Sequence, residues 1–303
     1  MFEGVRRRLL RVYERLLERE LSGAPAHVAV IQDGNRRYAR KEGGEATDGH
    51  RAGARTTERM LDWCADLGVE ELTLYAFSTE NFERPPEERE QLFDLIEDKL
   101  REFADRPEVH ESEVRIRAIG EIDRLPARVR EAVDYAEART AGYDRFTLNV
   151  ALAYGGRAEL LSAARDVARA VERGDLSADE VGVAAVEDRL YRGPARDVDL
   201  IIRTGGDERT SNFLPWHANG NEAAVFFCSP YWPEFRRVDF LRAIRTYESR
   251  QASWRRSRAE RALALVRSLG DVELTEARQV LSRFRDALPG EVEELDREEQ
   301  AVD

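Results

Sequence analysis

The chain has 303 residues and a formal net charge of −12, and it is long enough to bury one large core or two smaller ones. Because no apolar run could cross a bilayer and the N-terminal residues show no signal-peptide pattern, we expect a cytoplasmic protein. The negative charge argues against nucleic acid as a partner, since nucleic-acid-binding surfaces carry an excess of basic residues.

The first predicted element is an amphipathic helix over residues 3–21, within an N-terminal segment that we place at residues 1–24. Arginines fill much of its surface, and its apolar side chains recur at helical spacing: Val5, Leu9, Val12, Leu16 and Leu17. Two interpretations fit this pattern. The helix either packs on the main domain or makes a peripheral contact with anionic lipid at a membrane surface.

A short apolar run over residues 28–31 predicts a buried parallel strand. A turn and several basic residues follow it: Asp33, Gly34, Asn35, Arg36, Arg37, Arg40 and Lys41. Backbone N–H groups in such a turn form an anion-binding concavity, arginine adds bidentate phosphate recognition, and the Asp33 carboxylate can hold a divalent cation. The stretch predicts a Mg²⁺-assisted polyphosphate site, although an Asp-Gly-Asn turn taken alone is more often an ordinary turn.

Residues 41–49 are polar and glycine-rich, which predicts a mobile loop before a helix over residues 51–67. Gly68 suits the position that ends this helix. His50 stands at the helix start, where a histidine either caps the helix or contributes to an anion site.

The second predicted strand, residues 71–77, leads into a polar stretch at residues 78–84 and then into a helix over residues 86–104. The apolar face of this helix is broad: Leu92, Phe93, Leu95, Ile96, Leu100 and Phe103. Core packing is the default interpretation of this face. The functional interpretation is the wall of a tunnel for an apolar chain.

Further strands are predicted at residues 114–119, 146–152, 198–203 and 224–228, and further helices at residues 126–141, 157–173 and 178–191. Strands that alternate with helices predict an α/β fold with a mainly parallel central sheet of about six strands, flanked by helices. In such sheets ligands bind outside the carboxyl ends of the strands. The polar clusters follow predicted strand ends: Asp33, residues 78–84, residues 154–156 and residues 203–206.

The pattern changes after residue 250. Residues 255–269 and 275–288 predict two more helices, and the acidic stretch at residues 291–303 predicts disorder. We therefore divide the chain into the N-terminal helix, a main domain over residues 25–250 and a helical C-terminal extension with an acidic tail over residues 251–303.

A second anion site is predicted where the strand 198–203 ends in Arg203 and a Thr-Gly-Gly turn follows. The two glycines let the backbone approach an anion, and Arg209 and Ser211 add a guanidinium and a hydroxyl. An Arg-Thr-Gly-Gly run alone could be a plain turn, but the added arginine and serine favour diphosphate binding. Two separate diphosphate sites imply two diphosphate substrates.

Five stretches of the chain together resemble the cis-prenyltransferases, the undecaprenyl diphosphate synthase family. They read HVAVIQDGNRRYA at 27–39, LTLYAFSTENFERP at 72–85, LNVALAYGGR at 148–157, VDLIIRTGGDERTSNF at 198–213 and WPEF at 232–235. They follow one another in the family's order. The resemblance spans residues 26–250 and leaves out the N-terminal helix and the region past residue 250.

The resemblance implies the undecaprenyl diphosphate synthase fold and a Mg²⁺-dependent homodimeric enzyme, with catalysis in residues 25–250. Such an enzyme condenses isopentenyl diphosphate molecules onto an allylic primer, geranylgeranyl or farnesyl diphosphate, and makes each new double bond cis. The product would be a long-chain polyprenyl diphosphate for lipid-linked glycan carriers.

Carried over by position, the resemblance assigns Asp33 to Mg²⁺ and catalysis, and Glu222 to a second metal-side carboxylate from the dimer partner. Asn81 matches the position assigned to proton removal; because an amide is a poor base, we expect Asn81 to orient the substrate while a diphosphate oxygen or water takes the proton. The allylic diphosphate would contact Gly34, Asn35, Arg36, Arg37 and His50. Isopentenyl diphosphate would contact Arg203, Arg209 and Ser211. The remaining predicted substrate-binding residues are Tyr38, Ser78, Thr79, Glu80, Phe82, Arg84 and Thr210.

The main departure from the family pattern is Ala46, which stands where an arginine is usual. Either Arg40, Lys41 or Arg51 compensates for it, or the affinity for diphosphate is lower. The other departures keep the chemical type: Tyr38 and Phe82 for tryptophan, and Asp207 for glutamate.

The alternative function is a non-catalytic accessory subunit that stabilises a catalytic partner. Such subunits lose the metal-binding aspartate and the basic turn, whereas this chain keeps Asp33, Asn81, Arg203 and Arg209. A nucleotide-binding enzyme is disfavoured, because no Gly-x-Gly-x-x-Gly or Walker pattern follows any predicted strand.

Lysine occurs only at Lys41 and Lys99, while acidic residues and arginine are abundant. This balance is typical of proteins that stay soluble at high salt. We therefore expect a halophilic, haloarchaeal protein. An archaeal origin would be consistent with a geranylgeranyl primer and a dolichol-type carrier lipid.

Overall fold

The computed structural model describes residues 2–190, 196–218 and 223–268. The chain divides into two compact units, residues 1–244 and residues 245–303. All the polar clusters that the sequence placed after strand ends belong to the first unit.

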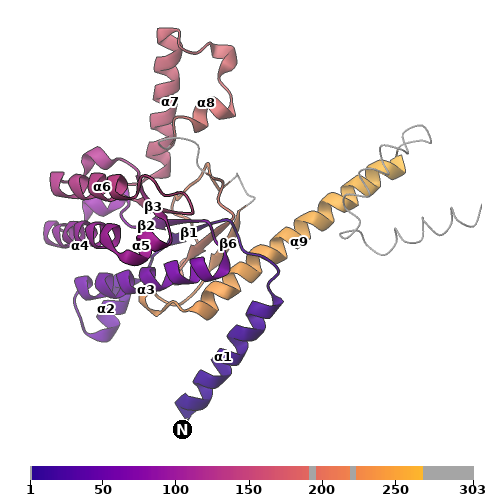
Figure 1. The fold of residues 1–303 in the computed structure, drawn as a ribbon. Coiled ribbons are helices and arrows are strands. Elements are labelled where there is room, and N and C mark those ends of the chain that lie inside the picture. Colours follow the sequence, from indigo (N-terminus) through magenta and orange to yellow (C-terminus); the bar gives the residue numbers. More distant parts are fainter. Residues whose placement is uncertain (1, 191–195, 219–222, 269–303) are drawn as a thin grey trace, which may run out of the picture. The chain divides into compact units, whose positions relative to one another are not determined.

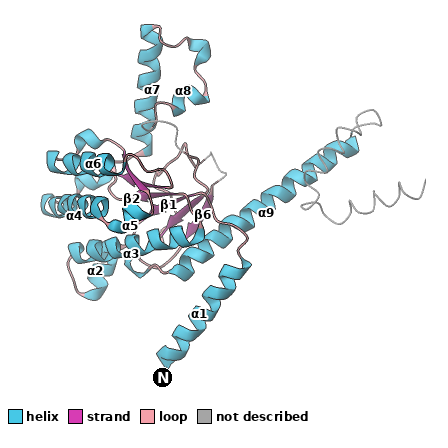
Figure 2. Ribbon diagram, in the orientation of Figure 1, coloured by secondary structure: helices cyan, strands magenta, loops and turns pink. Residues whose placement is uncertain are grey.

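A six-stranded sheet forms the centre of the first unit (Figures 1 and 2). Its strands are β1 (His27–Ile31), β2 (Glu71–Tyr75), β3 (Val114–Ile119), β4 (Phe146–Ala151), β5 (Leu200–Arg203) and β6 (Ala224–Phe227). They pair in the order β3-β4-β2-β1-β5-β6, and every pair is parallel. The predicted α/β fold with a parallel sheet is therefore confirmed. All five residues of β1 are buried, as expected for an apolar strand in the middle of such a sheet.

Helices cover both faces of the sheet. On one face, α4 (Pro86–Asp105) and α6 (Ala127–Thr140) share a core with β3, and α3 (Ala46–Leu67) packs beside α4. On the other face, Ala163 of α7 (Gly156–Arg173) packs with side chains of β1, β4 and β5. The shorter helices are α2 (Asn35–Glu42), α5 (Pro107–Glu111) and α8 (Val183–Glu187).

The predicted mobile loop over residues 41–49 is wrong. Helix α2 runs to Glu42, and α3 begins at Ala46 instead of residue 51. Gly43, in the left-handed region at φ 75°, ends α2, while Glu45 and Asp48 form a capping box that starts α3. The glycines therefore mark a tight corner between α2 and α3. The C-cap of α2 and the capping box of α3 order the backbone on the two sides of this corner.

The predicted helix over residues 178–191 is also wrong. The segment forms a 3₁₀ turn, Ala178–Glu180, and the short helix α8. Ser177 and Glu180 form a capping box at the start of the segment, but the extended backbone of Gly182 interrupts the helix that this box begins.

The N-terminal helix is present as α1 (Phe2–Glu20). Leu17 is buried against Val238 and Leu241, whereas Val12 and Leu16 are 53% and 58% exposed. The predicted apolar side of this helix is thus divided: one leucine packs on the domain and its neighbours remain at the surface.

A long helix, α9 (Arg237–Ser268), was predicted only in its later part, residues 255–269. Its first two turns belong to the first unit and bury Val238, Phe240, Leu241 and Ile244. The helix predicted over residues 275–288 and the acidic stretch 291–303 lie outside the described residues. Among the helices that the structure describes, none has the length and apolarity to span a membrane.

Candidate active site

Polar residues from four strands meet at the carboxyl edge of the sheet. Ile31 at the end of β1 pairs with Arg203 at the end of β5, so Asp33, two residues further on, lies beside Arg203. The segments after β2 and β4 meet through an isolated parallel bridge between Ser78 and Tyr154. Register therefore brings Asp33 and Arg203 together although they are 170 residues apart in the chain.

Two arginines hold Asp33 as a carboxylate. Arg203 Nη2 lies 2.7 Å from Asp33 Oδ2, and Arg37 Nη2 lies 3.1 Å from Oδ1, which also accepts a hydrogen bond from Gly34 N at 2.6 Å. Burial by itself would raise the pKa of Asp33, but the hydrogen bonds and charges of Arg203 and Arg37 outweigh it and keep that pKa below its usual value. Asp33 is therefore an anionic oxygen ligand at neutral pH.

Arg203 organises the turn that follows β5. Its side chain is only 4% exposed, so the turn packs around it. Its Nη1 donates to Ser211 Oγ and to the carbonyl oxygen of Arg209, both at 2.7 Å, and its Nη2 lies 3.3 Å from Asp207 Oδ2. Asp207 also pairs with Arg209 at 3.1 Å. The rigid guanidinium fork thus places a second arginine and a hydroxyl on the same turn.

Gly205 allows the two halves of the site to approach. Its φ is +87°, and a Cβ there would lie 2.6 Å from Arg37 Nη2 and 3.3 Å from the backbone of Asp33. The side chain of Thr204 completes the junction, because its hydroxyl accepts from Asp33 N at 3.0 Å and donates to Asp33 O at 2.7 Å. The Thr-Gly-Gly turn therefore binds the Asp33 turn directly.

A second group of charges lies around His50. Glu88, in the first turn of α4, pairs with Arg84 at 2.9 Å and with Arg36 at 3.4 Å. Burial, assisted by the charges of Arg84 and Arg36, lowers the pKa of His50 to about 4, so its imidazole is neutral at pH 7. His50 Nε2 is buried and has no hydrogen-bond partner in the described part of the protein. His50 is not the cap of α3, since Glu45 is its N-cap.

A polar cavity of about 400 Å³, here called the arginine cavity, joins these groups. Its lining residues are Gln32, Asp33, Gly34, Asn35, Arg36, Arg37, Arg40, His50, Arg84, Asp207 and Arg209. The lining contains five arginines and only two carboxylates, so the cavity carries a net positive charge that suits a polyphosphate.

Three residues were candidates to replace the arginine that the family usually has at the position of Ala46. Of these, Arg40 lines the arginine cavity. Lys41 instead pairs with Glu234 on the surface, and Arg51 does not line the cavity. Sequence reasoning did not identify Glu88 as part of the site; its only signal was its position at the positive end of a helix. Its role here is to hold Arg36 and Arg84.

Several predicted site residues do not line the arginine cavity. Asn81 Oδ1 accepts a hydrogen bond from Ser78 N at 2.9 Å and caps the 3₁₀ turn Thr79–Glu83. Phe82 packs on Phe77, with ring centroids 5.1 Å apart, and Tyr38 lines a separate groove. The other predicted residues outside the cavity lining are Ser78, Thr79, Glu80, Arg203, Thr210 and Ser211. Glu222 lies outside the described residues.

An apolar cavity of about 140 Å³ adjoins the arginine cavity, since Gln32, Asn35 and His50 line both. Its walls come from α3, α4 and strands β2 to β4. The residues that α4 contributes are Leu92, Leu95, Ile96, Lys99, Leu100 and Phe103. The broad apolar face of this helix therefore lines a cavity, while Phe93 packs in the core.

Asp33 and Asp207 are the two carboxylates of the arginine cavity, and a carboxylate is a ligand type that suits a magnesium ion. Mg²⁺ is usually bound through one or two carboxylates, several waters and the substrate phosphates, and does not need a dedicated protein cage. The described residues contain no cluster of three or more potential metal ligands. A single ionised carboxylate beside a phosphate-binding cavity is sufficient for such a site.

Comparisons with known proteins agree with this geometry. A family model described as "Putative undecaprenyl diphosphate synthase" matches residues 31–255. The chain is 71% identical to a tritrans,polycis-undecaprenyl-diphosphate synthase (geranylgeranyl-diphosphate specific) of Halobacterium salinarum and 67% identical to one of Haloarcula marismortui, each over 96% of both chains. The structure is also similar to the crystal structure of lavandulyl diphosphate synthase from Lavandula x intermedia in complex with dimethylallyl diphosphate. The TM-score is 0.70 and the sequence identity is 32%, and the match covers 74% of this chain and 95% of that one.

Proposed function

The chain belongs to the undecaprenyl diphosphate synthase family of prenyltransferases, and on this basis we propose that it condenses isopentenyl diphosphate onto an allylic prenyl diphosphate to build a long cis-polyprenyl diphosphate. The observation that carries the proposal is the junction of the two cavities at Gln32, Asn35 and His50. A molecule with a diphosphate head and a hydrocarbon tail fits this junction, because one side is lined by arginines and the other by aliphatic side chains.

The allylic primer places its diphosphate in the arginine cavity. Arg36, Arg37 and Arg40 lie on one helix that starts at the Asp33-Gly34 turn, so their guanidinium groups and the N-terminus of α2 face the same anion. Neutral His50 offers a ring nitrogen to this cavity and also borders the apolar one. The head is therefore held where the tail enters the hydrophobic space.

The second substrate, isopentenyl diphosphate, lies on the Arg203 turn. Arg203 donates to Ser211 Oγ and to the carbonyl oxygen of Arg209, and Asp207 pairs with both Arg203 and Arg209. Because the Thr-Gly-Gly turn is bonded to the Asp33 turn, the two diphosphates come to lie side by side. Holding both reactants in this way removes much of the entropic barrier to their reaction.

In the reaction, the C1–O bond of the allylic substrate breaks and C1 bonds to C4 of isopentenyl diphosphate, which then loses a proton from C2. The arginines stabilise the negative charge that builds on the departing diphosphate. Asn81 is fixed by its bond to the Ser78 backbone, which suits an orienting role. The proton passes to a diphosphate oxygen or to water, as a carboxamide is too weak a base.

The cofactor in this proposal is Mg²⁺, which Asp33 would hold together with the substrate diphosphate, and which would supply Lewis-acid stabilisation of the diphosphate charge. Asp33 can serve it because the arginines keep the carboxylate ionised. The resemblance to the family implies that Glu222 of a dimer partner reaches the same metal, and we therefore propose a homodimer.

Geranylgeranyl diphosphate is the primer we propose, because the two haloarchaeal relatives carry that specificity in their names. We place the enzyme in the cytoplasm, with a peripheral membrane contact through α1. Val12, Tyr13 and Leu16 are exposed on this helix, and its arginines suit anionic headgroups.

The test is to incubate purified protein with labelled isopentenyl diphosphate, Mg²⁺ and either geranylgeranyl or farnesyl diphosphate at high KCl, and to size the products by chromatography. A ladder that ends in a long polyprenyl diphosphate with the geranylgeranyl primer is expected. A folded protein that adds no unit would overturn the proposal and favour an accessory subunit.

Comparing Asp33→Asn with Asp207→Asn distinguishes metal binding by Asp33 from its ion pairing with Arg203. Asp33→Asn should lower kcat/KM by about 10²–10³-fold and weaken the response to Mg²⁺, since the metal that stabilises the diphosphate charge would lose its carboxylate ligand. Asp207→Asn is the matched control, because Asp207 also pairs with Arg203. That control should weaken isopentenyl diphosphate binding yet keep the Mg²⁺ response of the parent enzyme.

A further inference from the structure

Arg37 lies where the two proposed diphosphate sites meet. Its Nη2 is 3.1 Å from Asp33 Oδ1 on one turn and 3.9 Å from Asp207 Oδ2 on the other. Gly205 leaves room for it, since a Cβ on this glycine would lie 2.6 Å from the same nitrogen. A single guanidinium group therefore faces both turns, and its position affects each of them.

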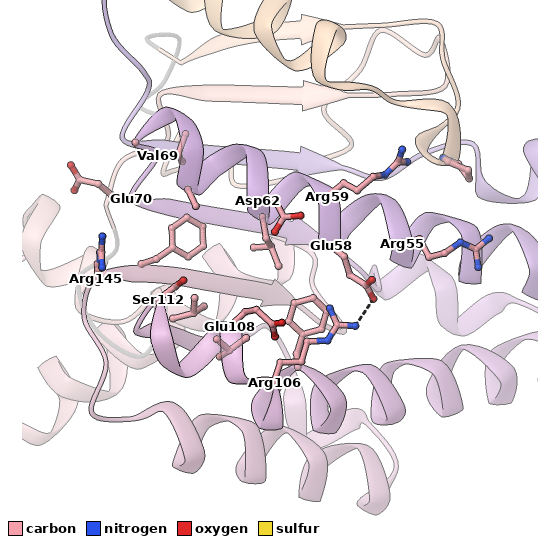
Figure 3. Close-up of a pocket in the computed structure, with 18 of the residues that line it drawn as sticks. Arg55, Glu58, Arg59, Asp62, Val69, Glu70, Arg106, Glu108, Ser112 and Arg145 are labelled. Atoms are coloured by element: carbon pink, nitrogen blue, oxygen red, sulfur yellow. Dashed lines mark hydrogen bonds and ion pairs between the residues drawn. The ribbon is translucent and has the colours of Figure 1, made fainter.

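An aromatic ring from a distant part of the chain covers this guanidinium group. The Arg37 guanidinium carbon lies 5.4 Å from the centroid of the Tyr231 ring, within cation–π distance. The next residue of α2, Tyr38, instead lines a groove of about 1040 Å³ along α3, which Figure 3 shows. Tyr231 does not line the arginine cavity itself. It can therefore act on the anion site only through Arg37.

The segment that carries Tyr231 is bonded to both turns through its backbone. Gly205 N donates to Pro230 O at 2.7 Å, and Trp232 N donates to Asp33 O at 2.9 Å. The two residues that flank Tyr231 are thus each fixed by a main-chain hydrogen bond. Because the backbone is held on both sides, the ring has one defined position.

Helix α2 packs on this segment along one face. Positions 34, 37 and 41 share that face, because residues three and four apart are neighbours on a helix surface. Gly34 contacts the Tyr231 ring, and Lys41 pairs with Glu234. The contact between Arg37 and Tyr231 lies between these two, so the helix holds the guanidinium group next to the ring.

We propose that Tyr231 is a positioning residue that fixes Arg37 for diphosphate binding. This inference rests on the proposed function and adds a residue outside the cavity that sets the affinity for diphosphate. The Arg37 side chain is 38% exposed, and such a side chain loses rotamer freedom when it binds an anion. A ring that holds the guanidinium group in place beforehand removes part of this cost and so raises the affinity.

The experiment compares Tyr231→Leu and Tyr231→Phe with the parent enzyme. Leucine removes the ring but stays apolar, whereas phenylalanine keeps the ring and loses the hydroxyl. Tyr135→Leu is the matched control, because the guanidinium carbon of Arg101 lies 5.7 Å from the Tyr135 ring and neither residue lines the arginine cavity. Two quantities are measured: the dissociation constant of inorganic diphosphate with Mg²⁺, by titration calorimetry, and the KM of each substrate in the condensation.

Tyr231→Leu should weaken diphosphate binding and raise the KM values by about 3- to 10-fold, as expected for the loss of a cation–π contact. Its kcat should stay close to that of the parent, since binding of ground state and transition state is lost equally. Tyr231→Phe and Tyr135→Leu should match the parent. Parent-like binding in Tyr231→Leu would overturn the inference.

A double-mutant cycle separates positioning of Arg37 from a general loss of structure. In an Arg37→Gln background the ring has no guanidinium group to hold, so Tyr231→Leu should cause no further loss of diphosphate binding. An equal loss in both backgrounds would overturn the inference, because a structural defect acts in both. If the parent binds diphosphate but adds no prenyl unit, the proposed function fails, and the binding cycle still decides the role of Tyr231.

Discussion

At the scale of single residues, the ion pair of Asp33 and Arg203 shows how the site is prepared. A part-buried ion pair contributes little net stability, because desolvation offsets much of the attraction. Its effect here is to keep Asp33 ionised and to hold the guanidinium fork towards the neighbouring turn. The same contacts that fix the two side chains thus place the proposed metal ligand, Asp33, beside the proposed phosphate-binding turn.

Arg203→Lys should lower kcat/KM by about 10–100-fold or more, mainly through a higher KM for isopentenyl diphosphate. An ammonium group cannot reach Asp33, Asp207 and Ser211 at once, and each hydrogen bond to a charged group contributes about 1.5–3 kcal/mol. Steady-state kinetics with each substrate varied in turn measures this. Arg173→Lys, which alters an exposed pair with Asp175, is the control and should be neutral. Equal kinetics in the two variants would contradict the role assigned to Arg203.

His50 should make the protein less stable as the pH falls from 6.5 towards 4. Its pKa is about 4 in the folded state against 6.5 for the free side chain, so between these values the unfolded chain binds the proton and the folded one does not. The difference corresponds to a loss of about 3 kcal/mol across this window. Urea unfolding of the parent and of His50→Gln from pH 7 to pH 4 checks it. The variant should lose less stability, and identical pH dependence in both proteins would contradict the prediction.

At the scale of elements, the corner between β1 and α2 depends on Gly34. This residue is the N-cap of α2, with φ at +98°, and it turns the chain so that the basic helix starts directly behind Asp33. The ring of Tyr231 packs against it, from the segment before the 3₁₀ turn Trp232–Glu234. The corner therefore joins parts of the chain that are nearly two hundred residues apart.

Gly34→Ala should lower the free energy of unfolding by about 2–5 kcal/mol. The left-handed backbone costs about 1–2 kcal/mol for a residue with a Cβ, and overpacking adds about 1–3 kcal/mol, because that Cβ would lie 2.5 Å from Tyr231 Cδ1. Gly43→Ala is the matched control: its φ is +75°, but nothing lies within 4 Å of the added carbon. Urea denaturation should show the control losing only the backbone part. Equal losses would show that contact with Tyr231 is unimportant.

At the scale of the whole molecule, the net charge of −12 and the near absence of lysine point to a protein adapted to high salt. Relatives from Halobacterium salinarum and Haloarcula marismortui share this chain's length and most of its sequence. Self-repulsion among acidic side chains destabilises the compact state unless it is screened.

The melting temperature should therefore rise with KCl, and activity should rise with it. The Debye length falls from about 10 Å at 0.1 M to about 3 Å at 1 M, which screens repulsion between separated surface charges. Thermal unfolding and initial rates measured over this range test the prediction. Potassium glutamate distinguishes general screening from an effect of chloride. Highest stability and activity in dilute buffer would contradict a halophilic adaptation.

The sequence by itself determined the parallel α/β fold and the polar motifs that follow its strands, because both depend on local patterns: apolar runs, turn residues and arginine spacing. It placed caps and helix ends less well, predicting a loop where Glu45 and Asp48 begin α3 and a helix that Gly182 interrupts. Only the tertiary structure decided that Arg40 and Glu88 join the site and that Tyr38 and Phe82 lie outside its cavity. It also decided that the apolar cavity adjoins the arginine cavity. These properties depend on the register of β1 with β5 and on the packing of α3 against α4, which bring together residues with no shared local pattern.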